Sequence, residues 1–287
     1  MEMNHFVKSH GLGNEYVVLD SESVGFPLNE SNIKKICNVH FGIGSDGILL
    51  KVPSRNADFG LNIFNPDGSE AEKSGNGLRI FSKYLFDYKW SKGNNFTVET
   101  KGGIVRASVI ESIKDRARVI KIDMGKALFE STVIPVNCSK PECIDEPLSV
   151  GDAQFAINCV SVGNPHCVIL REKLDSDEIK KYGPQIENNK MFPHRINVQF
   201  AKVLNDSEVE ILIWERGAGF TLASGSSSCA VASVLYKKGL IQSTAAVHML
   251  GGTLKISIDK LWNLQMTGEV KQIAEGVLSA DLLEELG

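Results

Sequence analysis

The feature that most constrains the fold of this chain is an internal repeat. Residues 61–85, LNIFNPDGSEAEKSGNGLRIFSKYL, align without a gap with residues 211–235, ILIWERGAGFTLASGSSSCAVASVL, so each position has its counterpart 150 residues later. Gly13-Asn14, followed by YVVLD, and Gly163-Asn164, followed by CVIL, keep the same spacing. The repeat predicts two copies of one strand-rich unit with a central helix, and not a solenoid, whose periods are shorter.

Strands dominate the predicted secondary structure, and two helices stand out among them. The helices are predicted at residues 76–90 and 226–238, each apolar on more than half of its circumference, which is typical of a helix surrounded by sheet. A further helical pattern covers residues 31–40. Apolar or alternating runs rich in Val, Ile and Phe predict strands at residues 4–10, 16–20, 47–52, 58–64, 95–100, 103–109, 155–162, 167–171, 196–203, 209–214, 254–258 and 261–266.

The domain boundary is expected in residues 123–147, a stretch of mixed polarity with three prolines. We therefore predict an α/β fold of the α+β type with two similar domains. The first comprises residues 1–122 plus 269–287, and the second comprises residues 123–268.

Composition excludes several classes of protein. The net charge of −4 in 287 residues disfavours a strongly basic nucleic-acid or membrane-surface protein. The six cysteines form no CxxC pair and the six histidines do not cluster, so neither a zinc site nor a disulfide framework is indicated. No signal-peptide stretch and no run of about 18 apolar residues is present. We expect a cytoplasmic protein.

Residues 42–47, GIGSDG, match the G-x-G-x-x-G pattern of dinucleotide-binding loops. Such a loop follows a strand and opens a helix, but here a helical pattern precedes the glycines and an apolar strand follows them. The order favours a glycine-rich turn from helix to strand.

Ser74-Gly75 and Ser224-Gly225 occupy equivalent positions in the repeat, each just before a predicted buried helix. A serine there is most often an N-cap. Two such helix ends meeting about a pseudo-twofold axis would bind a carboxylate, with one serine on each face of the adjacent carbon. His166 and Glu215 are candidate general bases. Asn65 and Arg216 end equivalent strands, and Arg216 is suited to a second carboxylate unless it forms a surface ion pair.

The chain resembles the diaminopimelate epimerase family, whose cofactor-independent enzymes interconvert LL- and meso-diaminopimelate. The resemblance rests on HGLGNEYVVLD, FNPDGSEAEKSGNG, VGNPHCV, the RIN of HRINVQF, WERGAG and MTGEV, in family order along nearly the whole chain. It implies two similar domains, each a barrel-like set of strands around a central helix, with the active site in the cleft between them. It also implies a cytoplasmic homodimer of amino-acid (lysine) biosynthesis that needs neither pyridoxal phosphate nor metal.

The resemblance also implies the site residues. Ser74 and Ser224 stand at the catalytic positions, and His166 and Glu215 match the residues paired with them. The distal end of the substrate would be held by Asn65, Asn164, Asn197 and Arg216. The reacting end would lie at Asn14, Gly75, Asn76, Gly225 and Ser226.

The departure from the family is at the two catalytic positions, which are cysteines in the family and serines here. A free thiol has a pKa of about 8.5 and can be tuned into the working range, whereas an alcohol is a far weaker acid. Three interpretations follow. The serines relay protons to His166 and Glu215, or those two act directly, in an amino acid epimerase or racemase. Alternatively the protein is a same-fold isomerase using His and Glu chemistry, as in phenazine biosynthesis, or an amino acid-binding homologue with weakened catalysis. Engineered Cys→Ser substitutions would leave the same pattern. We expect the first, acting on a small amino acid, with a diamino-dicarboxylate favoured.

Overall fold

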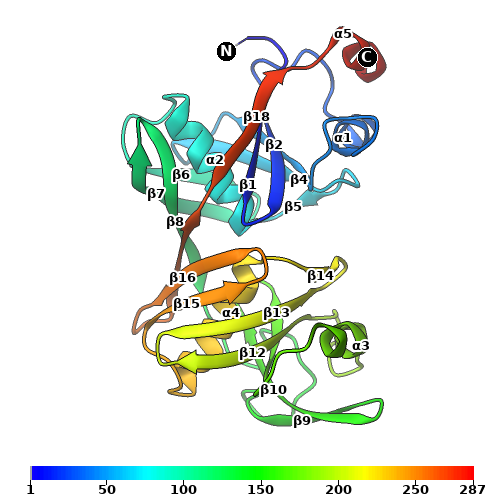
Figure 1. Cartoon of the computed structure of the whole chain (residues 1–287), viewed down its shortest axis with the longest axis vertical. Coiled ribbons are helices and arrows are strands. Elements are labelled where there is room, and N and C mark those ends of the chain that lie inside the picture. Colours follow the sequence, from blue (N-terminus) through cyan, green and yellow to red (C-terminus); the bar gives the residue numbers. More distant parts are fainter. Residues whose placement is uncertain (1) are drawn as a thin grey trace. The chain divides into compact units, whose positions relative to one another are not determined.

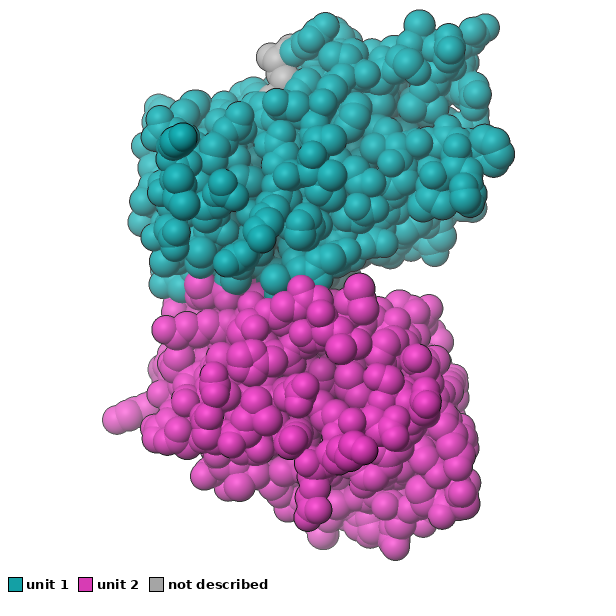
Figure 2. Space-filling model, in the orientation of Figure 1, with its two compact units in different colours: residues 1–122, 268–287 teal, residues 123–267 magenta. Residues whose placement is uncertain are grey.

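A computed structural model describes residues 2–287 of the chain. These residues form two compact units, which Figure 2 shows in different colours. Unit 1 comprises residues 2–122 together with 268–287, and unit 2 comprises residues 123–267. Each unit has its own core and is described by itself.

Unit 1 is a curved set of strands with a helix packed inside it (Figure 1). Along the chain, β1 pairs antiparallel with β2, β2 parallel with β3, β3 antiparallel with β4, and β4 parallel with β6. The C-terminal strand β18 returns to pair with β1. The elements are β1 (His5–Gly11), β2 (Asn14–Asp20), α1 (Glu30–Cys37), β3 (Ile48–Val52), β4 (Phe59–Phe64), β5 (Glu70–Ala71), α2 (Gly75–Asp87), β6 (Asn95–Thr100), β7 (Gly103–Ile113), β8 (Arg116–Lys126, continuing past the unit boundary), β18 (Lys271–Val277) and α5 (Ala280–Leu286).

Unit 2 repeats this succession of elements and pairings. Here β10 pairs antiparallel with β11, β11 parallel with β12, β12 antiparallel with β13, and β13 parallel with β15. The elements are β9 (Glu146–Val150), β10 (Ala153–Ser161), β11 (Pro165–Leu170), α3 (Ser176–Glu187), β12 (Asn197–Asn205), β13 (Glu208–Glu215), β14 (Gly219–Thr221), α4 (Gly225–Lys237), β15 (Thr244–Met249), β16 (Gly252–Ile258) and β17 (Asn263–Glu269, which ends in unit 1). The predicted fold class, a strand-rich mixed α/β fold built on a repeat, is confirmed.

The two central helices are the predicted ones, and they occupy equivalent places in the repeat. Helix α2 packs against β1, β2 and β7, and α4 packs against β10, β11, β12, β13, β15 and β16. Every residue of 76–85 in α2 is buried, which confirms the inference drawn from its wide apolar surface. The burial includes Lys83, whose ammonium donates to Asp87 at 2.7 Å and to the Ala117 carbonyl at 2.7 Å.

Other elements were absent from the sequence-based prediction. Helix α3 carries Pro184 and a largely polar surface, and α5 has seven residues, of which Leu286 alone is buried. Strand β18 is exposed along most of its length, so no apolar alternation marks it. Among residues 2–287, no helix is both long and apolar enough to cross a membrane.

The packing of α2 gives a prediction for stability. Phe81 is fully buried in this helix, so Phe81→Ala should lower the free energy of unfolding by about 3–5 kcal/mol through lost burial and the cavity left behind. Phe41 is 85% exposed, and Phe41→Ala should change it by no more than about 0.5 kcal/mol. Urea unfolding followed by circular dichroism measures both. Equal effects of the two substitutions would contradict the central position of α2.

Candidate active site

Ser74 ends the turn before α2 and caps that helix. Its Oγ accepts a hydrogen bond from the backbone N–H of Gly77 at 3.0 Å. The same oxygen lies 3.3 Å from the phenol oxygen of Tyr16, which reaches it from β2. The Ser74 oxygen therefore contacts two groups, the first turn of α2 and the phenol of Tyr16. Sequence reasoning missed Tyr16, although alternation along β2 places it on the same face as Asn14.

Asn14 and Asn76 belong to a chain of hydrogen bonds around the start of α2. Arg79 Nη2 donates to Asn76 Oδ1 at 2.8 Å, and Asn76 Nδ2 donates to Asn14 Oδ1 at 3.1 Å. Asn14 Nδ2 in turn donates to the carboxylate of Asp46 at 2.9 Å. These hydrogen bonds fix the orientation of the side-chain amides of Asn14 and Asn76, both predicted to bind substrate. Arg79 and Asp46 are positioning residues that the sequence did not reveal.

The glycine-rich turn at residues 42–47 has a structural role in this unit. It connects α1 to β3, which is the helix-to-strand order expected from the sequence. A Cβ added to Gly47, whose φ is +154°, would lie 2.8 Å from Cε1 of the Tyr16 ring and 2.3 Å from the Phe64 carbonyl oxygen. The turn therefore leaves room for the Tyr16 ring and presents Asp46 to Asn14.

Asn65 follows β4 and closes a tight turn. Its side chain donates to Ser69 Oγ at 2.9 Å, and its backbone N–H donates to the Ser69 carbonyl at 2.8 Å. The contacts of this predicted substrate-binding residue are thus within its own turn, and its side chain is half-buried.

Ser224 caps α4 in unit 2 as Ser74 caps α2 in unit 1. Its Oγ lies 3.4 Å from the backbone nitrogen of Ser227, which donates to it, and 3.4 Å from Ser226 Oγ. The carboxylate of Glu215, at the end of β13, accepts a hydrogen bond from Thr221 Oγ1 at 2.9 Å and lies close to the Ser224 hydroxyl. Burial raises the pKa of Glu215, and these two hydroxyls partly oppose that rise. Two of the predicted catalytic residues, Ser224 and Glu215, therefore lie near each other in unit 2.

His166 lies on β11 and its side chain is completely buried. Nε2 is 2.9 Å from Asn164 Oδ1. Burial lowers the pKa of His166 to about 3, the neighbouring Gln199 side chain favours the protonated ring, and the Arg216 guanidinium opposes it. At neutral pH the imidazole is therefore uncharged.

Gln199 is a second residue that the sequence did not reveal. It is fully buried on β12, and its Nε2 donates to Ser227 Oγ at 3.0 Å. Within residues 2–287, neither its Oε1 nor Nδ1 of His166 has a hydrogen-bond partner of standard geometry. Because Gln199 still favours the protonated ring, the contact between these two atoms is longer or less well aligned than a standard hydrogen bond. Gln199 thereby links His166 to the start of α4.

Asn197 and Arg216 meet at the ends of β12 and β13. Asn197 Nδ2 donates to the Pro165 carbonyl at 2.8 Å, and its Oδ1 accepts from the Arg216 backbone at 3.0 Å. The exposed Arg216 guanidinium donates to the His194 carbonyl at 3.0 Å. Asn197 therefore holds the strand ends in place, and the guanidinium retains donors for a ligand.

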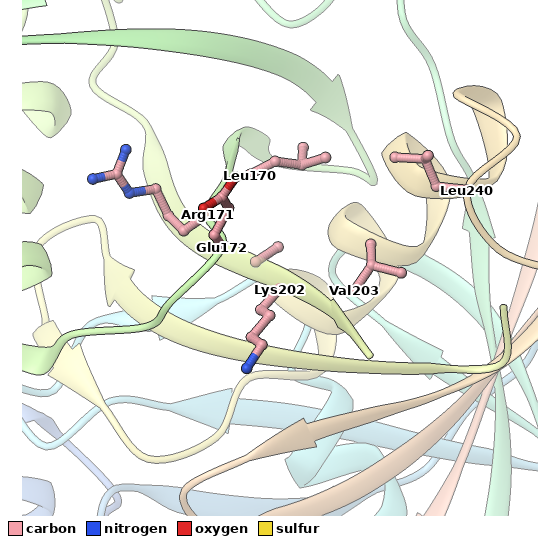
Figure 3. A pocket seen from close by; sticks show the side chains of 7 residues that line it. Leu170, Arg171, Glu172, Lys202, Val203 and Leu240 are labelled. Carbon is pink, nitrogen blue, oxygen red and sulfur yellow. The ribbon is translucent and has the colours of Figure 1, made fainter. Parts of the chain in front are cut away.

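A pocket of about 480 Å³ lies elsewhere in unit 2, at the ends of β11 and β12 (Figure 3). In Figure 3 the Arg171 guanidinium extends away from Val203 and Leu240, and it donates to Glu178 at 3.2 Å. The lining residues are Leu170, Arg171, Glu172, Ala201, Lys202, Val203 and Leu240. None of them is a predicted site residue, so this pocket is separate from the groups described above.

The duplicated unit, with its buried central helix, is a fold also found in solved structures of proteins named as racemases, epimerases and isomerases. A probable proline racemase from Agrobacterium radiobacter superposes with a TM-score of 0.72 at 13% identity, covering 96% of this chain and 93% of that one. A phenazine biosynthesis protein of the PhzF family from Bacillus anthracis gives a TM-score of 0.65 at 15% identity, covering 97% and 100%. These similarities establish the fold.

Sequence comparison identifies the family within that class. The family model described as diaminopimelate epimerase matches residues 6–130 and 158–273. "Diaminopimelate epimerase 2" from Nostoc sp. is 48% identical over 278 residues, covering 96% of each chain. The diaminopimelate epimerase of Acetivibrio thermocellus is 40% identical over 276 residues, covering 94% of this chain and 97% of its own. The chain belongs to the diaminopimelate epimerase family, and the resemblance found in its motifs is confirmed.

The burial of His166 gives a prediction for pH dependence. The folded ring has a pKa of about 3, whereas the unfolded ring titrates near about 6.5. Between these values the unfolded chain binds a proton that the folded protein does not, so this residue lowers the free energy of unfolding as the pH falls from 6.5 toward 3.

We therefore expect His166→Gln to show a smaller loss of stability over this pH range than the native protein, measured by urea unfolding. In the folded native protein, NMR of the imidazole nitrogens should show no protonation of His166 between about pH 5 and 8, where an unperturbed histidine titrates. A midpoint near 6.5 would show a solvated ring and contradict the assignment.

Proposed function

We propose that this protein is a cofactor-independent epimerase that interconverts LL- and meso-diaminopimelate by removing the Cα proton on one face and returning a proton on the other. The observation that carries the proposal is that Ser224 caps the buried helix α4 while the Glu215 carboxylate, held by Thr221 at 2.9 Å, lies close enough to the serine hydroxyl for that hydroxyl to oppose the rise of its pKa. An alcohol beside a base at a helix start suits proton transfer next to a bound carboxylate, which supports the proposal. Membership of the family, whose relatives carry this name, supports the substrate.

The catalytic groups in this proposal are Ser74, Ser224, His166 and Glu215. Removal of the Cα proton puts negative charge onto the adjacent carboxylate, and backbone N–H groups at the helix starts stabilise that charge as it develops. Ser224 passes the proton to the Glu215 carboxylate, whose raised pKa brings it closer to a neutral working pH. Ser74 serves the opposite face, and the buried His166, uncharged at neutral pH, is a further candidate proton acceptor.

The remaining predicted residues bind the substrate. Its reacting end is bound by Asn14 and Asn76, and by the helix starts Gly75, Gly225 and Ser226. Its distal end is bound by Asn65, Asn164, Asn197 and Arg216, with the guanidinium on the distal carboxylate. The family resemblance further supports a homodimer in the cytoplasm.

Hydrogen–deuterium exchange at Cα tests the proposal. In D₂O, LL-diaminopimelate incubated with the native protein should lose its Cα–H signal in NMR, because proton transfer passes through exchangeable groups. Since thiols are far better proton carriers than alcohols, Ser74→Cys/Ser224→Cys should exchange about 10² to 10⁴ times faster. A panel of L-amino acids serves as the specificity control. Silence of the native protein, with exchange in the cysteine variant, would identify a binding protein and refute turnover.

The role of Arg216 is tested separately by affinity. Arg216→Ala removes the guanidinium from the distal carboxylate, and we expect the Kd for LL-diaminopimelate to rise about 10- to 100-fold, which corresponds to a charged hydrogen bond of about 1.5–3 kcal/mol. Isothermal titration calorimetry measures the change. Arg106→Ala, at an exposed position of β7, is the control and should leave Kd unchanged. If Arg216→Ala behaves like this control, the assignment of the distal carboxylate is wrong.

A further inference from the structure

We propose that Tyr16 is a further catalytic residue, the acid that supplies the proton returned to Cα through Ser74. The inference rests on the proposed epimerase function and names the group that replaces the missing thiol on this side of the reaction. It starts from one contact, in which Tyr16 Oη lies 3.3 Å from Ser74 Oγ.

The hydrogen-bonding capacity of Ser74 fits a relay. A serine hydroxyl has one proton to donate and two lone pairs. The N–H of Gly77 occupies one lone pair at 3.0 Å. In the proposed relay the remaining lone pair accepts from Tyr16 Oη–H, which leaves the serine proton available to the substrate. Ser74 is half-buried whereas Tyr16 is 7% exposed, so the serine is the outer member of the pair.

The chemistry of the phenol fits the same role. A tyrosine has a pKa of about 10, much closer to the thiol value of about 8.5 than an alcohol is. The N-terminus of α2 carries partial positive charge, which stabilises the phenolate left behind after proton transfer. Ser74 alone lacks this acidity, and Tyr16 supplies it through a single hydrogen bond.

The position of the phenol is fixed by packing. The Tyr16 ring lies against the backbone of Gly47, where even a methyl group would come within 2.8 Å of Cε1. The strand that carries Tyr16 is paired on both sides, with β1 and with β3. A ring held this closely keeps Oη directed at Ser74, which is the geometric condition for proton transfer.

The step balances without any redox partner. On one face, the Cα–H bond breaks, its proton goes to Ser224 Oγ, and the Ser224 proton goes to the Glu215 carboxylate. On the other face, the Cα carbanion takes the proton of Ser74, and Ser74 takes the proton of Tyr16 Oη, leaving a phenolate. Glu215 then loses its proton to water and Tyr16 regains one from water, which restores the starting state.

In this assignment different residues remove the proton from Cα and return one to it, so the two steps can be tested separately. In Tyr16→Phe the ring packing stays and only the hydroxyl is lost. Proton removal by Glu215 and Ser224 remains, so Cα–H of LL-diaminopimelate should still exchange in D₂O within about threefold of the native rate. Formation of the meso isomer, measured by chiral chromatography, should fall at least about 10²-fold, the usual contribution of a general acid.

Two controls separate catalysis from structure. Tyr236→Phe, in α4 and outside the proposed machinery, should leave both rates unchanged. In a Ser74→Cys background the thiol carries the proton itself. Adding Tyr16→Phe to that variant should therefore lower its epimerisation rate by less than about threefold. Replacing Tyr16 by 3-fluorotyrosine, a more acidic phenol, should move the alkaline limb of the epimerisation rate to lower pH with the fold intact.

The exchange and epimerisation rates together decide whether Tyr16 is the acid. Retained exchange with lost epimerisation in Tyr16→Phe supports the assignment. Epimerisation by Tyr16→Phe at the native rate, or an alkaline limb that fluorotyrosine does not move, overturns the role of Tyr16 while the epimerase proposal stands. Equal loss of exchange and epimerisation identifies a structural or binding role and also overturns it. Absence of exchange and epimerisation in the native protein overturns both proposals together.

Discussion

The whole arrangement depends on the need to satisfy the N–H groups at the start of two buried helices. Helices α2 and α4 are packed against strands along their length, and the N–H groups at their starts need acceptors from outside the helix. Ser74 and Ser224 meet this need as N-caps. The same requirement places a hydroxyl, a set of donors and a positive dipole end at one point in each unit. The candidate chemistry therefore arises where the fold already demands polar groups inside a strand-rich core.

How much of the fold and of the candidate site can be predicted from the sequence depends on how far apart along the chain the interacting residues lie. The repeat, the two helices and their capping serines follow from local spacing, and the structure confirms the helices at Gly75–Asp87 and Gly225–Lys237. The contact of Tyr16 with Ser74 spans 58 residues and that of Gln199 with Ser227 spans 28. No local period encodes such pairs, because they are created by strand register and by the packing of a helix on a sheet.

The two units have the same topology but different chemistry. In unit 1 the capping serine contacts a phenol, and in unit 2 it contacts a carboxylate whose pKa is raised by burial. A phenol is protonated at neutral pH, whereas a carboxylate is mostly ionised there unless burial is extreme. The two equivalent helix starts therefore have different neighbours, a phenol in unit 1 and a carboxylate in unit 2.

Serine in place of cysteine changes what the surroundings must provide. A thiol at a helix N-terminus can hold and release a proton near neutral pH by itself, because the dipole and nearby charges bring its pKa into range. An alcohol cannot, since the same shifts leave it far too weak an acid. An alcohol can instead relay a proton between the substrate and a stronger acid or base beside it. Such a partner lies beside each serine, Tyr16 for one and Glu215 for the other, and the proposed epimerase activity of a family member with serines at these positions depends on it.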